Sequence, residues 1–362
     1  ANVGALLPIL LQACLDGYAE AKTPMQIIDH FFLQHTNAIS EADKVARLFK
    51  FVQYIERQIV LFDAIEDAAF DTVHNIEGAG SLKSLISETN FTGKSQLLKS
   101  KLRKFKVRVV LTAHPTQFYP GTVLSIINDL TRAIARNDIS EVRNLLQQLG
   151  NTPFSRKKKP SPYDEAILLS WYLGNIFYPV MGQIVDKFAG QYERAVLEDQ
   201  KLMTIGFWPG GDRDGNPFVN VDITRRVAAK LRYSIASCYH RDVRELKRRL
   251  TFQGSYEILD EIEKKLHDEM SESNPHSTLD AESLIAKLDE IETILVEQNQ
   301  GLFVEKLRSF RRKVQLFGFY FASLDIRQDG RVISSAFDAI IEKDPSLIGN
   351  ISELDEAQQV DK

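Results

Sequence analysis

The chain has 362 residues, enough for about two domains at the usual 100–200 residues each. Hydrophobic residues at 44% and charged residues at 26% are ordinary for a globular protein, and the low counts of 19 glycines and 12 prolines favour a helix-rich fold. A net charge of −4 argues against a general nucleic-acid binder. The two cysteines, Cys14 and Cys238, allow neither a disulfide framework nor a CxxC zinc site, which fits a reducing cytoplasm.

The most apolar stretch, residues 1–15, contains Pro8 and Gln12 and is shorter than the ~20 residues that cross a bilayer. We therefore expect no membrane segment. Apolar residues recur at helical spacing through residues 1–100, most clearly over 42–69. The sequence predicts an N-terminal helical region over 1–100, either separate from the rest or continuous with it.

The pattern changes over residues 101–362. Three short apolar runs, 107–112, 202–207 and 318–325, are typical of buried strands. Each is followed by a polar loop and then by a helical stretch; these stretches are 122–136, 222–250 and 332–341. The order predicts a mainly α-helical α/β fold, part of a helix-rich TIM-like barrel with three short parallel strands and large helical insertions. Because barrels of this kind use eight strands, we expect the chain to be a portion of something larger.

Aromatic residues gather just before and within the third apolar run. We expect them in the hydrophobic core, and they are Phe310, Phe317, Phe319, Tyr320 and Phe321.

Loops that leave the carboxyl ends of parallel strands carry the reactive groups of such folds. His114 follows the first predicted strand and precedes Pro115, which favours extended backbone at the histidine. An imidazole there suits acid–base chemistry near neutral pH. A histidine hydrogen-bonded within the core is an equally good interpretation.

The second loop, residues 210–217, reads GGDRDGNP. Its glycine and Asn-Pro pairs indicate tight turns that let backbone approach a ligand closely. Arg213 lies between Asp212 and Asp214, which are expected to hold its guanidinium for binding phosphate or carboxylate. An ion-paired surface turn is the alternative. A Ca²⁺ loop is disfavoured because the glutamate of the EF-hand pattern is absent.

The third loop contains Arg327, which Asp325 and Gln328 are expected to orient. A structural ion pair explains this arginine equally well. Two basic runs, 99–108 and 156–159, could contact phosphates, although most such runs are solvated faces.

Four segments, taken in order, resemble phosphoenolpyruvate carboxylase. They are residues 110–117 (VLTAHPTQ), 159–165 (KPSPYDE), 210–217 (GGDRDGNP) and 317–328 (FGFYFASLDIRQ). The resemblance implies a cytoplasmic, tetrameric enzyme built round an eight-stranded barrel. It also implies that phosphoenolpyruvate and bicarbonate are joined to give oxaloacetate and phosphate, with Mg²⁺ or Mn²⁺ as cofactor.

By the same resemblance, bicarbonate takes the phosphoryl group, which forms carboxyphosphate and the enolate of pyruvate. His114 would deprotonate carboxyphosphate and Arg213 would hold the phosphoryl or carboxylate oxygens. Arg327 and Asp214 would assist substrate binding. The family's metal-binding carboxylates lie in a C-terminal part that this sequence lacks. We therefore expect the N-terminal portion of the enzyme, without metal ligands and inactive in isolation.

The sequence departs from the family at two places. Pro120 and Gly121 stand where most members carry an arginine pair that binds a sugar-phosphate activator, and Val332 stands where the third motif usually continues to histidine. The alternative hypothesis is a truncated, non-catalytic relative that binds phosphorylated metabolites or partner subunits. Neither a nucleic acid nor a membrane is expected as a partner.

Overall fold

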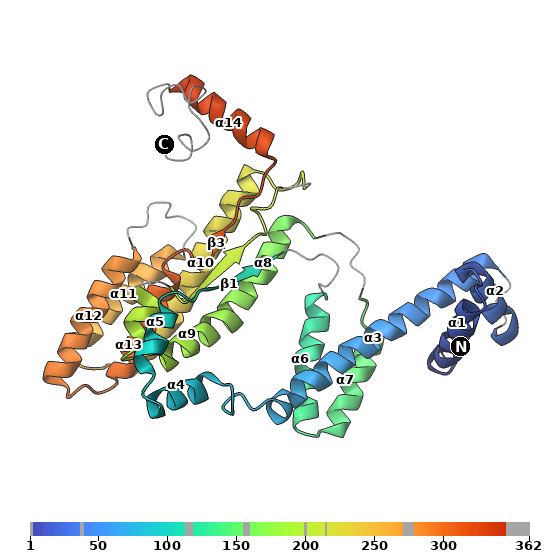
Figure 1. The fold of residues 1–362 in the computed structure, drawn as a ribbon, viewed down its shortest axis with the longest axis horizontal. Coiled ribbons are helices and arrows are strands. Elements are labelled where there is room, and N and C mark those ends of the chain that lie inside the picture. The colour runs from blue at the N-terminus through green and yellow to red at the C-terminus, as the bar shows by residue number, and fades with distance from the viewer. Residues whose placement is uncertain are drawn as a thin grey trace. The chain divides into compact units, whose positions relative to one another are not determined.

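The computed structural model describes residues 3–36, 40–112, 119–154, 160–198, 201–213, 216–270 and 279–344, which are mostly helical (Figure 1). Contacts divide the chain into two compact units that interleave along the sequence. Unit 1 contains Ala1–Ser81 and Thr116–Lys159, and unit 2 contains Leu82–Pro115 and Pro160–Lys362. The division into domains near residue 100 stays a prediction.

The regular elements of unit 1 in its described residues are all helices. Its helices are α1 (Val3–Ala19), α2 (Pro24–His35), α3 (Glu41–Val73), α6 (Gly121–Ala135) and α7 (Ile139–Asn151).

The long helix α3 organises unit 1, and its position confirms the helix predicted over 42–69. The side chain of Ser40 caps its N-terminus by accepting a hydrogen bond from the backbone of Asp43. Phe51 packs with aromatic residues of α2 near one end of α3. Val60 and Ala64 pack against α6 and α7 near the other end. The helix therefore joins two separate apolar clusters.

Unit 2 holds the described strands and the remaining helices. Its helices are α4 (Leu82–Phe91), α5 (Ser95–Leu102), α8 (Pro162–Tyr172), the π-helix η1 (Leu173–Phe177), α9 (Tyr178–Lys187), the π-helix η2 (Arg194–Glu198), α10 (Val221–Lys247), α11 (Ser255–Glu269), α12 (Ala281–Gln298), α13 (Val304–Phe317) and α14 (Gly330–Lys343). Its strands are β1 (Val107–Leu111), β2 (Met203–Phe207) and β3 (Ser323–Leu324).

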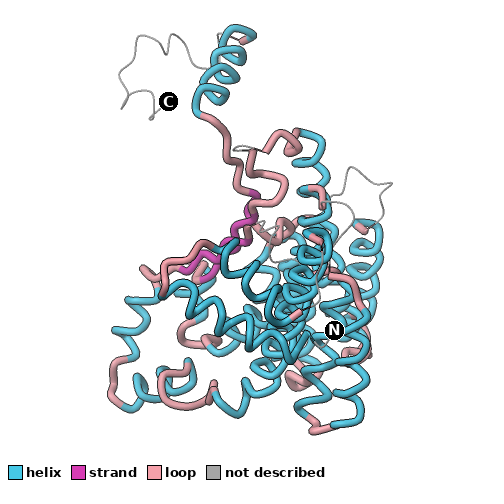
Figure 2. The backbone as a smooth tube through the Cα atoms, turned by 90° about the vertical axis from the view of Figure 1, so that its right-hand side faces the viewer, coloured by secondary structure: helices cyan, strands magenta, loops and turns pink. Residues whose placement is uncertain are grey.

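The strands form a parallel sheet in the order β1-β2-β3, shown in magenta in Figure 2. Val107 pairs with Met203, and Gly206 pairs with Ser323, so the three carboxyl ends lie side by side. The prediction of a helix-rich α/β fold with three short parallel strands is confirmed. A closed barrel is not formed by the three strands of the described residues.

The third strand is shorter than the predicted run of 318–325. Gly318 has φ +56° and Phe321 has φ +61°, left-handed conformations that no strand continues through. The backbone turns there because Phe317, Phe319 and Phe321 are all buried in the aromatic core beneath the sheet. Burial, and not strand formation, explains the apolar character of this run.

Two buried tyrosines organise the aromatic core. Tyr239 of α10 donates a hydrogen bond to the carbonyl of Gly318 at 2.6 Å, and Tyr178 of α9 donates to Asp242 at 2.8 Å. Burial, followed by the negative charge of Asp242, raises the pKa of Tyr178 well above its usual value. The core prediction is confirmed for Phe310, Phe317, Phe319 and Phe321 and is wrong for Tyr320, which is 78% exposed.

Within the ranges that the structure describes, no helix combines the length and apolar character needed to cross a membrane.

Helices α11 and α12 are joined by an ion pair on the surface of unit 2. Glu261 accepts hydrogen bonds from Lys287 of α12 at 2.6 Å and from Lys265 one turn along its own helix at 2.9 Å. These two hydrogen bonds, that from Lys287 first, lower the pKa of Glu261 from 4.5 to about 2. The depressed pKa means that the folded state favours the ionised carboxyl.

Stability should therefore fall as acid protonates Glu261. The contribution is complete above the unfolded pKa of 4.5 and is lost as the pH falls through the folded pKa of about 2. We expect Glu261→Gln to weaken the pH dependence of the thermal midpoint between these two values. The control is Glu290→Gln on α12, because Glu290 makes no ion pair with any described residue. Equal pH profiles for the Glu261 variant and the unmodified chain would contradict this account.

Candidate anion-binding site at the carboxyl edge of the sheet

The carboxyl edge of the sheet brings two polar loops together. The backbone of Trp208, just after β2, donates to the carbonyl of Leu111 at 2.9 Å. The backbone of Asp325, just after β3, donates to the carbonyl of Phe207 at 3.0 Å. The loops that follow β2 and β3 therefore start from the same edge, at which β1 also ends.

The loop after β2 turns tightly around Trp208. The backbone amides of Gly211 and Asp212 both donate to the carbonyl of Trp208, at 2.8 and 2.9 Å. Gly210 has φ +80°, which favours glycine. A Cβ at Gly211 would collide with the backbone oxygen of Asp325. These glycines are what allow the two loops to lie backbone against backbone.

The two loops continue the parallel pairing beyond the strands. Asp212 and Arg327 form a parallel bridge. Arg327 donates its backbone N–H to Gly211 at 3.1 Å, and Arg213 donates its own to the carbonyl of Arg327 at 2.9 Å. The structure therefore brings together two arginines that are more than a hundred positions apart in the sequence.

Arg327 is held by a carboxylate and an aromatic ring. Its Nη1 lies 3.0 Å from Oδ2 of Asp212, and its guanidinium carbon lies 4.5 Å from the ring centre of Trp208. Ring stacking leaves the edge of a guanidinium able to form further hydrogen bonds. With a side chain that is 43% exposed, Arg327 can reach a ligand at this edge.

Arg213 is held without a carboxylate among the described residues. Its Nη2 donates to the hydroxyl of Thr224, in the first turn of α10, at 3.0 Å. Its Nε is buried and has no hydrogen-bond partner in the described part of the chain. A buried N–H that lacks a partner is costly, so the site is chemically suited to an anion that would accept from it.

The predicted orienting partners of both arginines need correction. Asp212 pairs with Arg327 and not with its sequence neighbour Arg213, whose Nη2 donates to Thr224 instead. Asp325 does not orient Arg327; its carboxylate pairs with Arg108 of β1. Each carboxylate therefore holds an arginine from another segment.

Two predicted site residues, His114 and Asp214, lie outside the described residues. Their roles stay predictions. Sequence reasoning did not find Thr224 or Trp208 as residues of the site. The signals for both were weak, since a threonine early in a helix and an aromatic residue after a strand are common.

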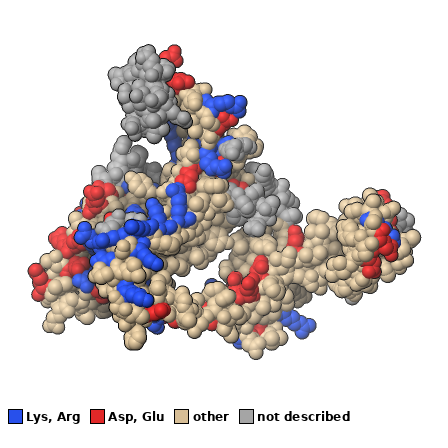
Figure 3. Space-filling model, in the orientation of Figure 1, with Lys and Arg blue, Asp and Glu red and all other residues tan. Residues whose placement is uncertain are grey.

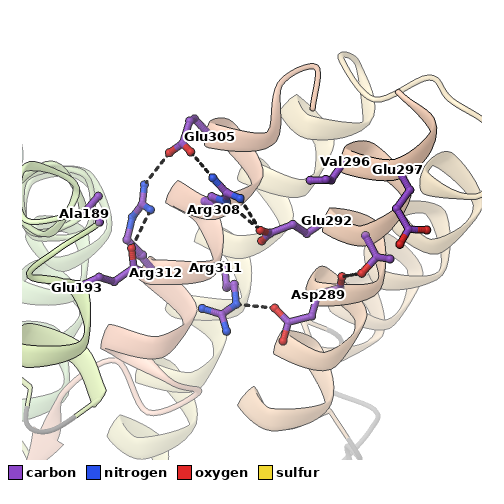
Figure 4. Close-up of a pocket in the computed structure, with 12 residues that line it drawn as sticks. Ala189, Glu193, Asp289, Glu292, Val296, Glu297, Glu305, Arg308, Arg311 and Arg312 are labelled. Atoms are coloured by element: carbon purple, nitrogen blue, oxygen red, sulfur yellow. Dashed lines mark hydrogen bonds and ion pairs between the residues drawn. The ribbon is translucent and has the colours of Figure 1, made fainter. Parts of the chain in front are cut away.

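A separate cavity of about 770 Å³ lies between α12, α13 and the segment that follows α9 (Figure 4). Its arginines face carboxylates. Arg308 lies 2.8 Å from Glu292, and Arg311 lies 2.6 Å from Asp289. Arg312 is buried and lies 2.7 Å from Asp186 of α9. These paired charges indicate a structural network that ties the three helices together.

The basic run 99–108 lies at the opposite end of β1 from the candidate site. Lys and Arg side chains gather over the face of unit 2 that carries α5 (Figure 3), and Lys101, Lys104 and Lys106 are exposed. Of this run, Arg108 pairs with Asp325 at the sheet, whereas these three lysines are exposed. The second basic run, 156–159, lies outside the described residues.

Among the described side chains, no group of three or more His, Cys, Asp or Glu residues could hold a metal ion.

The sequence matches the phosphoenolpyruvate carboxylase family over residues 26–278 and 259–361. The chain belongs to this family. Phosphoenolpyruvate carboxylase from Shewanella loihica is 28% identical over 278 residues, which are 64% of this chain and 31% of the relative. The enzyme from Pseudomonas putida strain F1 is 28% identical over 310 residues, which are 73% of this chain and 35% of the relative.

A phosphoenolpyruvate carboxylase from Aliivibrio salmonicida is 24% identical over 327 residues, which are 79% of this chain and 37% of the relative. The chain thus spans about a third of the length of the curated relatives that it matches. The family match supports the resemblance seen in the four motifs.

We expect Gly211→Ala to disrupt the pairing of the two loops. The new methyl group meets the backbone of Asp325, which cannot move as a flexible side chain would. Overpacking of this kind costs about 1–3 kcal/mol, measurable as a lower urea midpoint. The matched control is Gly150→Ala in α7, where an added Cβ meets nothing within 4 Å. The assignment fails when both variants unfold at the midpoint of the unmodified chain.

Proposed function

We propose that this chain is the N-terminal portion of a phosphoenolpyruvate carboxylase, in which it supplies the anion-binding part of the active site. The observation that carries the proposal is the pair of arginines, Arg213 and Arg327, brought together by backbone hydrogen bonds at the carboxyl edge of the sheet. The family match supports the same assignment.

Phosphoenolpyruvate suits two guanidinium groups held in this way. It carries a phosphoryl group and a carboxylate, and arginine binds both through paired N–H groups. The buried Nε of Arg213, which has no partner among the described residues, is a donor for such an anion, and the guanidinium of Arg327 stacks on Trp208 at the same edge of the sheet. We assign Arg213 to the phosphoryl or carboxylate oxygens and Arg327 to a supporting contact.

In the proposed reaction a bicarbonate oxygen attacks the phosphorus, and the bond from phosphorus to the enol oxygen breaks. Carboxyphosphate and the enolate of pyruvate result. His114 would then take the proton of carboxyphosphate, which breaks down to CO₂ and phosphate, and the enolate carbon attacks CO₂. β1 ends at Leu111, three residues before His114, and beside Trp208. This proximity in sequence supports the proposed role of the histidine, and Asp214 is proposed as a substrate-binding residue.

The barrel, the oligomeric state and the cellular location that the family resemblance implies are also proposals. Val107 and Val110 of β1 are 39% and 38% exposed, although parallel strands normally are covered on both faces, and this supports a larger barrel. The described residues do not fit Mg²⁺ or Mn²⁺, so we derive no step through the metal. We propose a homo-oligomer in the cytoplasm, where the free Cys14 and Cys238 would stay reduced.

Substrate binding is testable on this chain through Trp208. Trp171→Phe removes the only other tryptophan and leaves Trp208, whose ring lies under Arg327, as the reporter. We expect a saturable fluorescence change with phosphoenolpyruvate. Arg213→Gln should weaken it about 10- to 100-fold, the effect of losing a charge-assisted hydrogen bond.

The matched control is Arg244→Gln, because Arg244 of α10 is exposed and forms an ion pair with Glu263 of α11. Equal loss of binding in both arginine variants, or none in either, would exclude Arg213 as the anion-binding residue.

Catalysis is testable on the full product of the gene with a coupled malate dehydrogenase assay, in the presence of bicarbonate and Mg²⁺. We expect oxaloacetate formation, which His114→Asn should abolish while phosphoenolpyruvate binding persists, because asparagine cannot take the proton. Full turnover in the variant would refute the role of His114. Phosphoenolpyruvate binding without any turnover of the unmodified product would favour the non-catalytic relative.

A further inference from the structure

The hydroxyl of Thr224 lies at the centre of a small hydrogen-bond network around Arg213. Oγ1 lies 2.7 Å from the carbonyl of Gly210 and 3.0 Å from the carbonyl of Asn220. Both are acceptors only, so the single hydroxyl proton goes to one of them. The lone pairs of Oγ1 are then left for Arg213, whose Nη2 lies 3.0 Å away.

Thr224 itself is fixed by the fold. It lies one turn after Asn220, whose side chain caps α10 by accepting from the backbone of Ile223 at 3.0 Å. A methyl group and a hydroxyl on Cβ leave few rotamers in a helix. Gly210, the other end of the network, packs so closely on α10 that a Cβ there would lie 2.6 Å from Val227. The hydroxyl therefore has a defined position relative to the loop.

We propose that Thr224 is a positioning residue that sets the pose of the Arg213 guanidinium. Its hydroxyl holds Nη2 and leaves for the ligand the other N–H groups, among them the Nε that has no partner in the described residues. A neutral oxygen holds the cation without cancelling its charge, as a carboxylate would. The positioning stands on the geometry alone, whereas the ligand, phosphoenolpyruvate, rests on the proposed function.

The test observes Arg213 directly by side-chain nitrogen NMR, with Arg213→Lys to assign its signals. A guanidinium held at Nη2 rotates slowly about its Nε–Cζ bond and shows separate Nη signals. We expect Thr224→Val to merge these signals and Thr224→Ser to keep them apart. Thr131→Val is the matched control, because Thr131 also donates to a backbone carbonyl of its own helix, at 3.0 Å. If valine prevents folding, Thr224→Ala, which adds no atom, repeats the test with the same expectation.

Titration with phosphoenolpyruvate supplies a second readout. Thr224→Val should raise its dissociation constant about 5- to 10-fold, as expected for one hydrogen bond, and Thr224→Ser should restore it. Unchanged Arg213 signals in the valine variant would overturn the positioning. If the Arg213 signals change with the Thr224 variants but the chain does not bind phosphoenolpyruvate, the positioning role of Thr224 is upheld and the proposed function is refuted.

Discussion

One ion pair across the sheet fixes the register on which the site depends. Arg108 of β1 reaches over Gly206 of β2 to Asp325, which follows β3. A Cβ at Gly206 would lie 2.8 Å from Asp325 Oδ2 and 3.0 Å from Arg108 Nε, so only glycine leaves room for the pair as it stands. The two side chains are 46% and 26% exposed, and such pairs add little stability. What the pair contributes is specificity, because a one-residue slip would turn the side chains to the other face.

That register decides which loop residues meet beyond the strands. Phe207 lies opposite Leu324, and Asp212 lies opposite Arg327 although the loop after β2 has two more residues, which its turn around Trp208 takes up. The backbone bond from Arg213 to Arg327 follows from the same alignment. Two short strands therefore bring the backbones of two arginines together at one edge, although the sequence between β2 and β3 forms four helices, α10 to α13.

Much of the fold was predictable because helices and buried strands produce short-range hydrophobic patterns in the sequence. The apolar spacing over 42–69 predicted α3, and the apolar runs predicted β1 and β2 nearly to the residue. The third run, 318–325, was predicted as a longer strand than the structure shows. Its buried aromatic residues lie in a turn, and a buried turn and a buried strand can have the same apolar composition. The arginines of the site were predictable from their loops, but their partners were not. A contact such as that of Thr224 with Arg213 depends on where α10 begins and how the loop closes, which no local pattern encodes.

The partners also explain why the arginines of this chain differ in what they can do. Arg312 lies within 4 Å of Asp186, Glu193 and Glu305, so an arriving anion would have to displace carboxylates that already neutralise it. Arg213 has no described carboxylate as a partner and is oriented by a hydroxyl, while its Nε is buried and has no hydrogen-bond partner in the described residues. Desolvated donors with fixed directions bind an anion more strongly than mobile ones in water, since little reorganisation remains at the moment of binding. Arg312 and Arg213 therefore differ in the charge of the groups that hold them, and this difference favours Arg213 as the proposed anion-binding residue.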